Sequence, residues 1–121
     1  MFEISIETHF NADHALKLSE NLIEPCHAHD WIVNAVVSSE KLNNIGIVMD
    51  FHKLKGIIEN ITSELSDINL GDLQYFQQNN PSAENVAKYI FEKLEPQLPK
   101  NVKLEYISVV EEPTCKGIFR K

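Results

Sequence analysis

The stretch Phe2-Glu3-Ile4-Ser5-Ile6-Glu7-Thr8-His9-Phe10 places apolar side chains at nearly every second position. A period of two is typical of a β-strand with one buried and one exposed face. His14 has the same parity as the apolar positions, so we expect it to end the buried face of this strand. The chain therefore begins with a half-buried strand that carries a histidine at its end.

A second strand is predicted over His27–Ser38, after a polar segment, 17–25, that indicates a loop. Four apolar residues would share one face of the second strand: Trp31, Val33, Ala35 and Val37. Lys41–Gly46 has the composition of a turn, and a short third strand, Ile47–Met49, is expected after it.

Two amphipathic helices are predicted in the middle of the chain. Asp50 is a natural N-cap for the first helix. The apolar residues of this helix recur at the i, i+3, i+4, i+7 spacing of one face; they are Phe51, Leu54, Ile57, Ile58, Ile61 and Leu65. Ser82 caps the second helix, which follows the polar stretch Gly71–Pro81 and ends before Pro96. Its predicted buried stripe consists of Val86, Ala87, Ile90 and Leu94.

The tail of the chain predicts two more strands, Val102–Val110 and Gly117–Phe119. Strands on both sides of a pair of helices are typical of an α+β fold, in which the helices cover one face of an antiparallel sheet. A chain of 121 residues without internal repeats fits one domain, 1–121.

The composition excludes several classes of function. A net charge of -7 and a single arginine, Arg120, leave no basic surface of the kind that binds nucleic acid. No segment has the roughly 20 apolar residues of a membrane span, and no export signal is recognisable. We therefore expect a complete cytoplasmic protein without nucleic-acid or membrane partners, in which Cys26 and Cys115 are free thiols.

Three histidines form a candidate metal site. His27 and His29 are two positions apart on one strand, so their side chains would point to the same side, about 6.6 Å apart. His14, at the end of the neighbouring strand, would supply a third imidazole. Three imidazoles with a vacant fourth position are the arrangement of catalytic zinc. The alternative is that these histidines are ordinary surface residues of a structural oligomeric protein.

Four short motifs occur along the chain in one order. They are Phe10-Asn11-Ala12-Asp13-His14, His27-Ala28-His29, Met49-Asp50-Phe51 and Pro81-Ser82-Ala83-Glu84-Asn85-Val86-Ala87. This order resembles the 6-pyruvoyl- and 6-carboxy-tetrahydropterin synthases. The resemblance implies a T-fold, an antiparallel sheet with two helices on one face, whose subunits close a barrel as a homo-oligomer, a trimer or hexamer, with active sites between subunits.

The resemblance also implies site residues. It places Zn²⁺ on His14, His27 and His29, and a small-molecule pterin substrate beside it. Glu111 matches the late glutamate that accepts hydrogen bonds from the pterin ring, a contact suited to a carboxylate. Without the resemblance, Glu111 would be taken for a solvated residue at a strand end.

The sequence departs from the family pattern at the proton-transfer residues. Ile23 stands where the best-known members have a catalytic cysteine, but Glu24-Pro25-Cys26-His27-Ala28-His29 fits a subset with Glu-x-x-His-x-His. Glu24 is then the candidate base, the alternative being a loop glutamate. Cys26 is expected to be structural and to face away from the metal, because adjacent side chains of a strand alternate.

The second departure concerns the family's Asp-His relay, which aligns with Leu65–Gly71. Asp67 takes the place of the relay histidine and is a candidate acid–base group, the alternative being a helix-end cap. The resemblance implies a zinc-dependent lyase of pterin metabolism that acts on 7,8-dihydroneopterin triphosphate, of the 6-pyruvoyl- or 6-carboxy-tetrahydropterin synthase type. The alternatives are an aldolase-like variant that cleaves the side chain of dihydroneopterin, or a zinc protein that only binds a pterin or purine.

Overall fold

A five-stranded sheet organises the molecule, with the strand order β5-β1-β4-β6-β7. The computed structural model describes all 121 residues. The strands of the sheet are β1 (Phe2–His14), β4 (His27–Ser39), β5 (Ile68–Asn69), β6 (Lys103–Glu112) and β7 (Cys115–Phe119). All neighbours are antiparallel except β5, which lies parallel to β1. The sheet is therefore antiparallel in all but one short edge strand.

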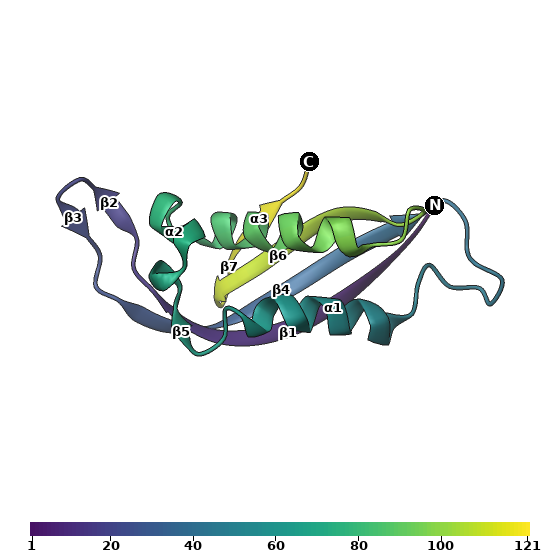
Figure 1. Ribbon diagram of the computed structural model, residues 1–121, viewed down its shortest axis with the longest axis horizontal. Coiled ribbons are helices and arrows are strands. Elements are labelled where there is room, and N and C mark those ends of the chain that lie inside the picture. Colours follow the sequence, from purple (N-terminus) through teal and green to yellow (C-terminus); the bar gives the residue numbers. More distant parts are fainter.

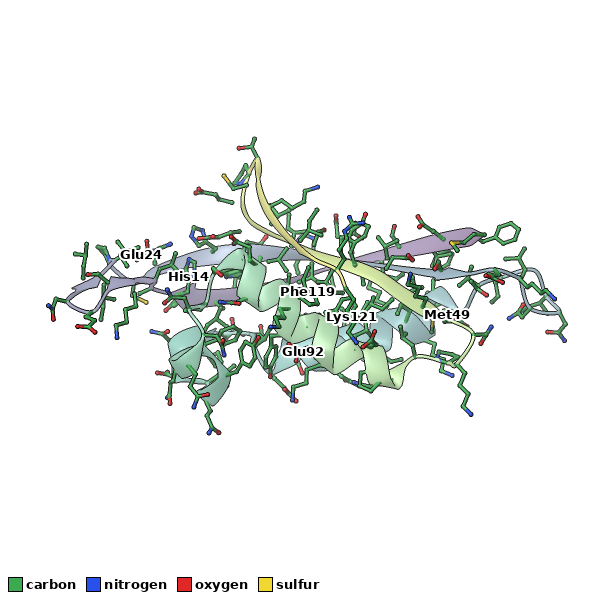
Figure 2. All side chains as sticks on the ribbon, turned by 90° about the horizontal axis from the view of Figure 1, so that it is seen from above. His14, Glu24, Met49, Glu92, Phe119 and Lys121 are labelled. Atoms are coloured by element: carbon green, nitrogen blue, oxygen red, sulfur yellow. The ribbon has the colours of Figure 1, made fainter.

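Helices cover one face of this sheet, as Figure 2 shows. The two long ones are α1 (Phe51–Ser63), which packs on β1, and α3 (Ala83–Leu94), which packs on β6 and β7 (Figure 1). Short helical segments complete the layer: η1 (Leu70–Asp72), α2 (Gln74–Gln78) and η2 (Glu95–Gln97). This is the α+β architecture that the sequence predicts.

Both helix N-caps predicted from the sequence are formed. The Asp50 carboxylate accepts hydrogen bonds from the backbone N–H groups of His52 and Lys53, and the Ser82 hydroxyl accepts one from Asn85. None of the helices has the length and apolar character that a membrane span requires.

The core lies between the sheet and the two long helices. Strand β4 contributes its fully buried alternate residues, Trp31, Val33, Ala35 and Val37. The predicted stripe of α3, formed by Val86, Ala87, Ile90 and Leu94, is also fully buried. In α1 the prediction for Phe51 is wrong, since its side chain is 53% exposed, whereas Leu54 and Ile58 are buried as expected.

The predicted third strand, Ile47–Met49, does not form. The carboxamide oxygen of Asn43 accepts hydrogen bonds from the N–H groups of Ile45 and Ile47, and Gly46 has a φ of 83°. The turn takes the Ile47 N–H, the first donor of the predicted strand, because a local side-chain acceptor competes with ladder bonds. Val48 and Met49 are instead buried as irregular chain.

Two segments expected to be irregular contain regular structure. The 17–25 segment forms a hairpin of β2 (Lys17–Ser19) and β3 (Leu22–Ile23), which extends beyond one end of the main sheet (Figure 1). The Gly71–Pro81 stretch includes α2. Strand β6 also continues past the predicted Val110 to Glu112, which places Glu111 within a strand.

Candidate metal centre and active site

Strand pairing brings the three predicted histidines together. In the antiparallel register of β1 and β4, His14 lies opposite His27, and Ala12 lies opposite His29. His14 and Ala12 belong to the helix-facing side of β1, which is buried at both positions. The alternation of the two strands therefore directs three imidazoles to one side of the sheet, as the sequence predicts.

The histidine Nε2 atoms converge with one carboxylate oxygen. The Nε2 atoms of His14 and His27 are 2.9 Å apart. Oε1 of Glu111 lies 2.7 Å from Nε2 of His14, 3.3 Å from Nε2 of His29 and 3.8 Å from Nε2 of His27. The four potential ligand atoms all lie within 4.8 Å of one another. We refer to His14, His27, His29 and Glu111 as the four-residue cluster.

Backbone carbonyls set the tautomers of two histidines. The Nδ1 atom of His14 is 2.7 Å from the carbonyl oxygen of Pro81, and Nδ1 of His27 is 2.9 Å from that of Pro25. A carbonyl only accepts, so each Nδ1 carries the hydrogen and donates it. In the neutral imidazole, Nε2 then presents a lone pair, which is the state a metal ligand requires.

The arrangement fits a divalent cation. Nε2 of His29 is buried and has no hydrogen-bond partner, although such atoms are normally satisfied. A single proton cannot satisfy several acceptors that meet at one point, whereas a cation can. Ligand atoms around tetrahedral zinc are about 3.4 Å apart, from zinc–ligand distances near 2.1 Å. The separations of Glu111 from the three histidines, 2.7 to 3.8 Å, bracket that value.

Trp31 packs against two histidines of the cluster. Its fully buried indole packs edge-on against His14 and His29, with ring centroids 4.8 and 6.0 Å away. The indole N–H donates to the carbonyl of Ala12 at 3.1 Å, which ties β4 to β1 at this point. The two histidine rings are therefore held by packing against a rigid part of the core.

His27 is the most exposed histidine of the cluster, with 39% of its side chain accessible. Its hydrogen bond to the Pro25 carbonyl raises its pKa above the ordinary value of 6.5, partly opposed by burial. The negative charges of Glu24 and Glu111 raise this pKa further. Both carboxylates therefore act on the same imidazole.

Comparison with known proteins identifies the family to which the chain belongs. The family model described as 6-pyruvoyl tetrahydropterin synthase matches residues 3–121. The chain belongs to the 6-pyruvoyl tetrahydropterin synthase family.

Relatives in this family cover nearly all of the chain. The dihydroneopterin monophosphate aldolase of Pyrococcus furiosus is 37% identical over 102 residues, which is 84% of this chain and 82% of that protein. The 6-carboxy-5,6,7,8-tetrahydropterin synthase of Bacillus subtilis is 26% identical over 124 residues, 98% of this chain and 77% of that protein. The family thus joins synthases and an aldolase of pterin metabolism.

Solved structures agree on the fold. The 6-pyruvoyl tetrahydropterin synthase of Caenorhabditis elegans superposes with a TM-score of 0.85 at 24% identity, covering 99% of this chain and 95% of that chain. The Plasmodium falciparum synthase gives a TM-score of 0.76 at 23% identity, covering 99% and 97%. The chain therefore has the T-fold of the tetrahydropterin synthases.

Glu24 lies close to the cluster. Figure 2 shows Glu24 and His14 at the same end of the molecule. The Glu24 side chain accepts a hydrogen bond from the backbone N–H of Leu16 through Oε1 at 2.9 Å, and its own N–H donates to the Leu16 carbonyl. The carboxylate is therefore held against the chain at the base of the hairpin, with its second oxygen outside this bond.

Cys26 is exposed and is not one of the four cluster residues. Its sulfur accepts a hydrogen bond from the side-chain amide of Asn69 at 3.4 Å. This contact joins the start of β4 to β5, which packs against the far edge of β1. The thiol is therefore outside the cluster, and its hydrogen bond from Asn69 is a structural contact.

Asp67 lies apart from the cluster within one chain. It has a φ of 62°, and its N–H donates to the carbonyl of Asn11. It lines a hollow of about 310 Å³ between β1 and the end of α1, together with His9 and Glu59, and no cluster residue lines this hollow. The two predicted acid–base residues are therefore separated, with only Glu24 near the histidines of its own chain.

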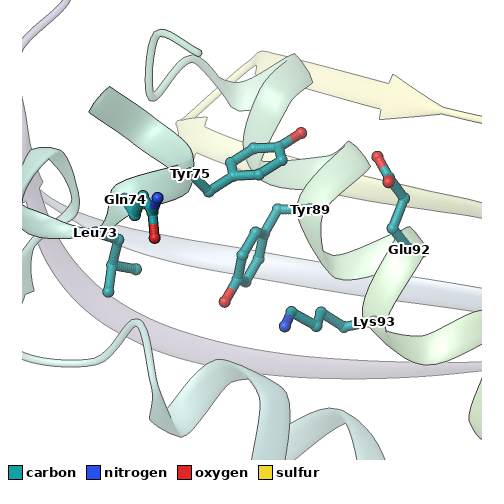
Figure 3. A pocket seen from close by; sticks show the side chains of 6 residues that line it. All are labelled: Leu73, Gln74, Tyr75, Tyr89, Glu92 and Lys93. Atoms are coloured by element: carbon teal, nitrogen blue, oxygen red, sulfur yellow. The ribbon is translucent and has the colours of Figure 1, made fainter. Parts of the chain in front are cut away.

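Another hollow, of about 430 Å³, lies between α2 and α3. Figure 3 shows Tyr75 and Tyr89 in it, flanked by Glu92 and Lys93. Burial, followed by a nearby glutamate, raises the pKa of each of the two tyrosines. None of the predicted site residues lines this hollow, so it is separate from the four-residue cluster.

Sequence reasoning missed three features of the site. Two of them are the backbone carbonyls of Pro25 and Pro81, which orient His27 and His14. The third is Trp31, which packs against His14. Pro81 stands in one of the family motifs and Pro25 within the Glu-x-x-His-x-His segment, but backbone acceptors leave no side-chain signal. Trp31 lies two residues after His29 on the same face, so the strand alternation could have indicated it.

Proposed function

We propose that this protein is a zinc-dependent lyase that cleaves the side chain of a phosphorylated dihydroneopterin by a retro-aldol reaction. The observation that carries this proposal is the cluster of three histidines and Glu111, with a second carboxylate, Glu24, held beside it and Asp67 in place of the family's relay histidine. The 37% identity to an enzyme named dihydroneopterin monophosphate aldolase supports the same reaction.

The retro-aldol reaction needs few proton transfers. The bond between the first two side-chain carbons breaks, and its electron pair passes to the carbon attached to the ring, where the conjugated imine of the dihydropterin can accept it. The hydroxyl on the second carbon loses its proton and becomes an aldehyde. A proton then adds to the first carbon, which leaves a hydroxymethyl group, so no oxidant or reductant is required.

Zinc held by His14, His27 and His29 would polarise the side-chain oxygens of the substrate. In the proposal, Glu24 takes the hydroxyl proton and returns a proton to carbon, so that one carboxylate acts as both base and acid. Its hydrogen bond from the Leu16 N–H fixes one oxygen and leaves the other for the substrate. In the Plasmodium vivax 6-pyruvoyltetrahydropterin synthase, a catalytic residue that is a glutamate has been replaced in two solved variants.

Glu111 would accept hydrogen bonds from the ring N–H groups of the pterin. Its side chain is 24% exposed, so the carboxylate has access to an incoming ring. Asp67 would act on the site of a neighbouring subunit, because it does not reach the cluster of its own chain. This assignment requires a homo-oligomer with active sites between subunits.

The charge distribution favours a substrate with one phosphate over a triphosphate. The chain has 11 basic residues against 18 acidic ones, and no Lys or Arg forms an ion pair with Glu24 or Glu111. A triphosphate would need several cations to balance its charge. A monophosphate needs fewer cations, because it carries less negative charge.

The test is a product analysis with zinc-loaded protein and either dihydroneopterin monophosphate or dihydroneopterin triphosphate. The proposal predicts a hydroxymethyl dihydropterin and a phosphorylated two-carbon aldehyde, identified by mass. A product that keeps all side-chain carbons, or one that carries a carboxyl group on the ring, would instead indicate a synthase reaction and overturn the aldolase proposal. If the protein converts neither compound, both the aldolase proposal and the synthase alternative are wrong.

A further inference from the structure

We propose that Glu111 is the fourth protein ligand of the metal in the substrate-free enzyme, so that the site rests closed and opens only when this carboxylate moves away. The inference rests on the proposed function for the presence of the metal, and it adds a second role to a residue otherwise assigned to the pterin ring.

The position of the Glu111 carboxylate is the first argument. One oxygen, Oε1, contacts the metal-facing nitrogens of all three histidines, at 2.7, 3.3 and 3.8 Å. An anchor for the far end of a bound pterin would not need to reach the point where the three Nε2 atoms converge. A carboxylate oxygen at this point is a good zinc ligand.

Strand alternation directs Glu111 toward the cluster, and a β-bulge frees it from β7. Val109 lies opposite the buried Val33, so Glu111, two residues further along β6, points to the same side of the sheet as the histidines. The β6–β7 register shifts between Val110 and Glu112, which leaves Glu111 without a partner on β7. Pairing of β6 with β4 also ends one residue earlier, at Ile32 and Val110. Bulges redirect side chains and are frequent beside active sites. Glu111 is thus free of the ladder on both sides, and its side chain can turn toward His14 and His29.

The charges of the cluster are consistent with a fourth ligand. Neutral His14 and His27 donate through Nδ1 to carbonyls, so their Nε2 atoms face Glu111 Oε1 with lone pairs. A lone pair close to a carboxylate is unfavourable unless a proton or a cation lies between them. A divalent cation would attract all four atoms and would be partly neutralised by the single negative charge.

Closure by four protein ligands has a functional consequence. Zinc sites with four protein ligands are typically structural, whereas catalytic sites keep one position for water or substrate. Catalysis at this site therefore requires Glu111 to leave the metal. Glu111 is partly exposed, 24% against none for His14, and unlike His14 and His27 its side chain is not held by a backbone carbonyl. It is therefore the ligand with room to move. Once displaced from the metal, the same carboxylate can accept hydrogen bonds from the pterin N–H groups.

A competing explanation is that Glu111 only accepts a hydrogen bond from a protonated His14. Glu111→Gln separates the two, because glutamine keeps a hydrogen-bonding side chain of the same length but loses the charged ligand oxygen. Glu112→Gln is the matched control. Glu112 is the next residue of β6, is exposed, and loses the same charge.

The experiment uses Co²⁺ as a spectroscopic probe and chelator competition to measure metal affinity, both without any pterin. For Glu111→Gln we expect metal affinity to fall by about 10- to 100-fold or more, and the visible Co²⁺ spectrum to change. Glu112→Gln should match the wild type in both. Glu111→Asp, which keeps a carboxylate on a shorter side chain, should recover part of the affinity.

If Glu111→Gln binds metal as tightly as Glu112→Gln and has the same Co²⁺ spectrum, the inference is wrong. Far-ultraviolet circular dichroism and the elution volume of each variant check that it is folded and assembled. Because no substrate is present, the result is independent of turnover. An enzyme that fails to cleave dihydroneopterin phosphates would overturn the proposed function and leave this measurement standing.

Discussion

His14 and His27 face each other across β1 and β4, with their Nε2 atoms 2.9 Å apart and their Nδ1 atoms bound to the carbonyls of Pro81 and Pro25. The pairing register brings the rings together, and the two carbonyls decide which nitrogen of each ring faces the partner. The geometry of the four-residue cluster therefore depends on backbone acceptors from two separate loops as much as on the histidines themselves.

Zinc should stabilise the folded protein through this cluster. A ligand at about 100 times its dissociation constant raises the free energy of unfolding by about 2.7 kcal/mol. We expect chelator treatment to lower the melting temperature and zinc to restore it, as measured by scanning calorimetry. His29→Ala should abolish the zinc effect, and His52→Ala, at an exposed position of α1, should retain it. Equal zinc effects in both variants would contradict the assignment.

Glu24→Gln should reduce kcat of the retro-aldol reaction by about 10²- to 10⁴-fold, because a positioned base contributes that much. Zinc content should stay at the wild-type level, since Glu24 is not among the four residues of the cluster. Glu20→Gln, an exposed residue in the same hairpin, is the control. An unchanged kcat in Glu24→Gln would show that the base lies elsewhere.

Asp67 can be tested by mixing inactive subunits. If Asp67 serves a neighbouring subunit, Glu24→Gln and Asp67→Asn should each be inactive alone, yet hetero-oligomers of the two should recover activity. Random equal mixing leaves about a quarter of the sites with both residues intact. Activity is measured after the variants are dissociated and reassembled together. Recovery of no activity from mixed oligomers would argue against sites shared between subunits.

Gly117 and Gly56 should respond in opposite directions to alanine. A Cβ at Gly117 would lie 2.8 Å from the backbone nitrogen of Glu84 at the start of α3, so Gly117→Ala should lower the free energy of unfolding by about 1–3 kcal/mol. A Cβ at Gly56, inside α1, would meet nothing within 4 Å. Gly56→Ala should therefore stabilise the protein by about 1 kcal/mol. Urea unfolding measures both, and a stabilised Gly117→Ala would contradict the packing of β7 on α3.

Stability should fall at alkaline pH because of Tyr75 and Tyr89. Burial, and then the charges of Glu92 and Glu64 respectively, raise their pKa values above the ordinary 10.0. Above pH 10 the unfolded chain loses these protons while the folded protein keeps them, so stability is complete below that pH and declines as pH rises through the folded pKa values. Tyr89→Phe should flatten this decline in urea unfolding experiments. An identical pH profile would exclude a contribution from Tyr89.

Local patterns predicted much of this protein. Alternation identified β1 and β4, and the capping residues Asp50 and Ser82 marked where both long helices begin. The same alternation placed His14, His27 and His29 on one face, because side-chain direction along a strand repeats every two residues. One wrong prediction was the strand Ile47–Met49, where the Asn43 side chain takes the N–H of Ile47, which a strand would use.

The sequence alone thus determined the alternating strands, the helix starts and the three histidines, since each depends on residues close along the chain. Only the tertiary structure decided that Glu111 joins the histidines, that Glu24 lies beside them and that Asp67 does not. The position of Glu111 beside the histidines depends on the register of β4 and β6, which pairs residues that are far apart in sequence. A one-residue change in that register would turn its side chain to the other face of the sheet, and no local pattern specifies it.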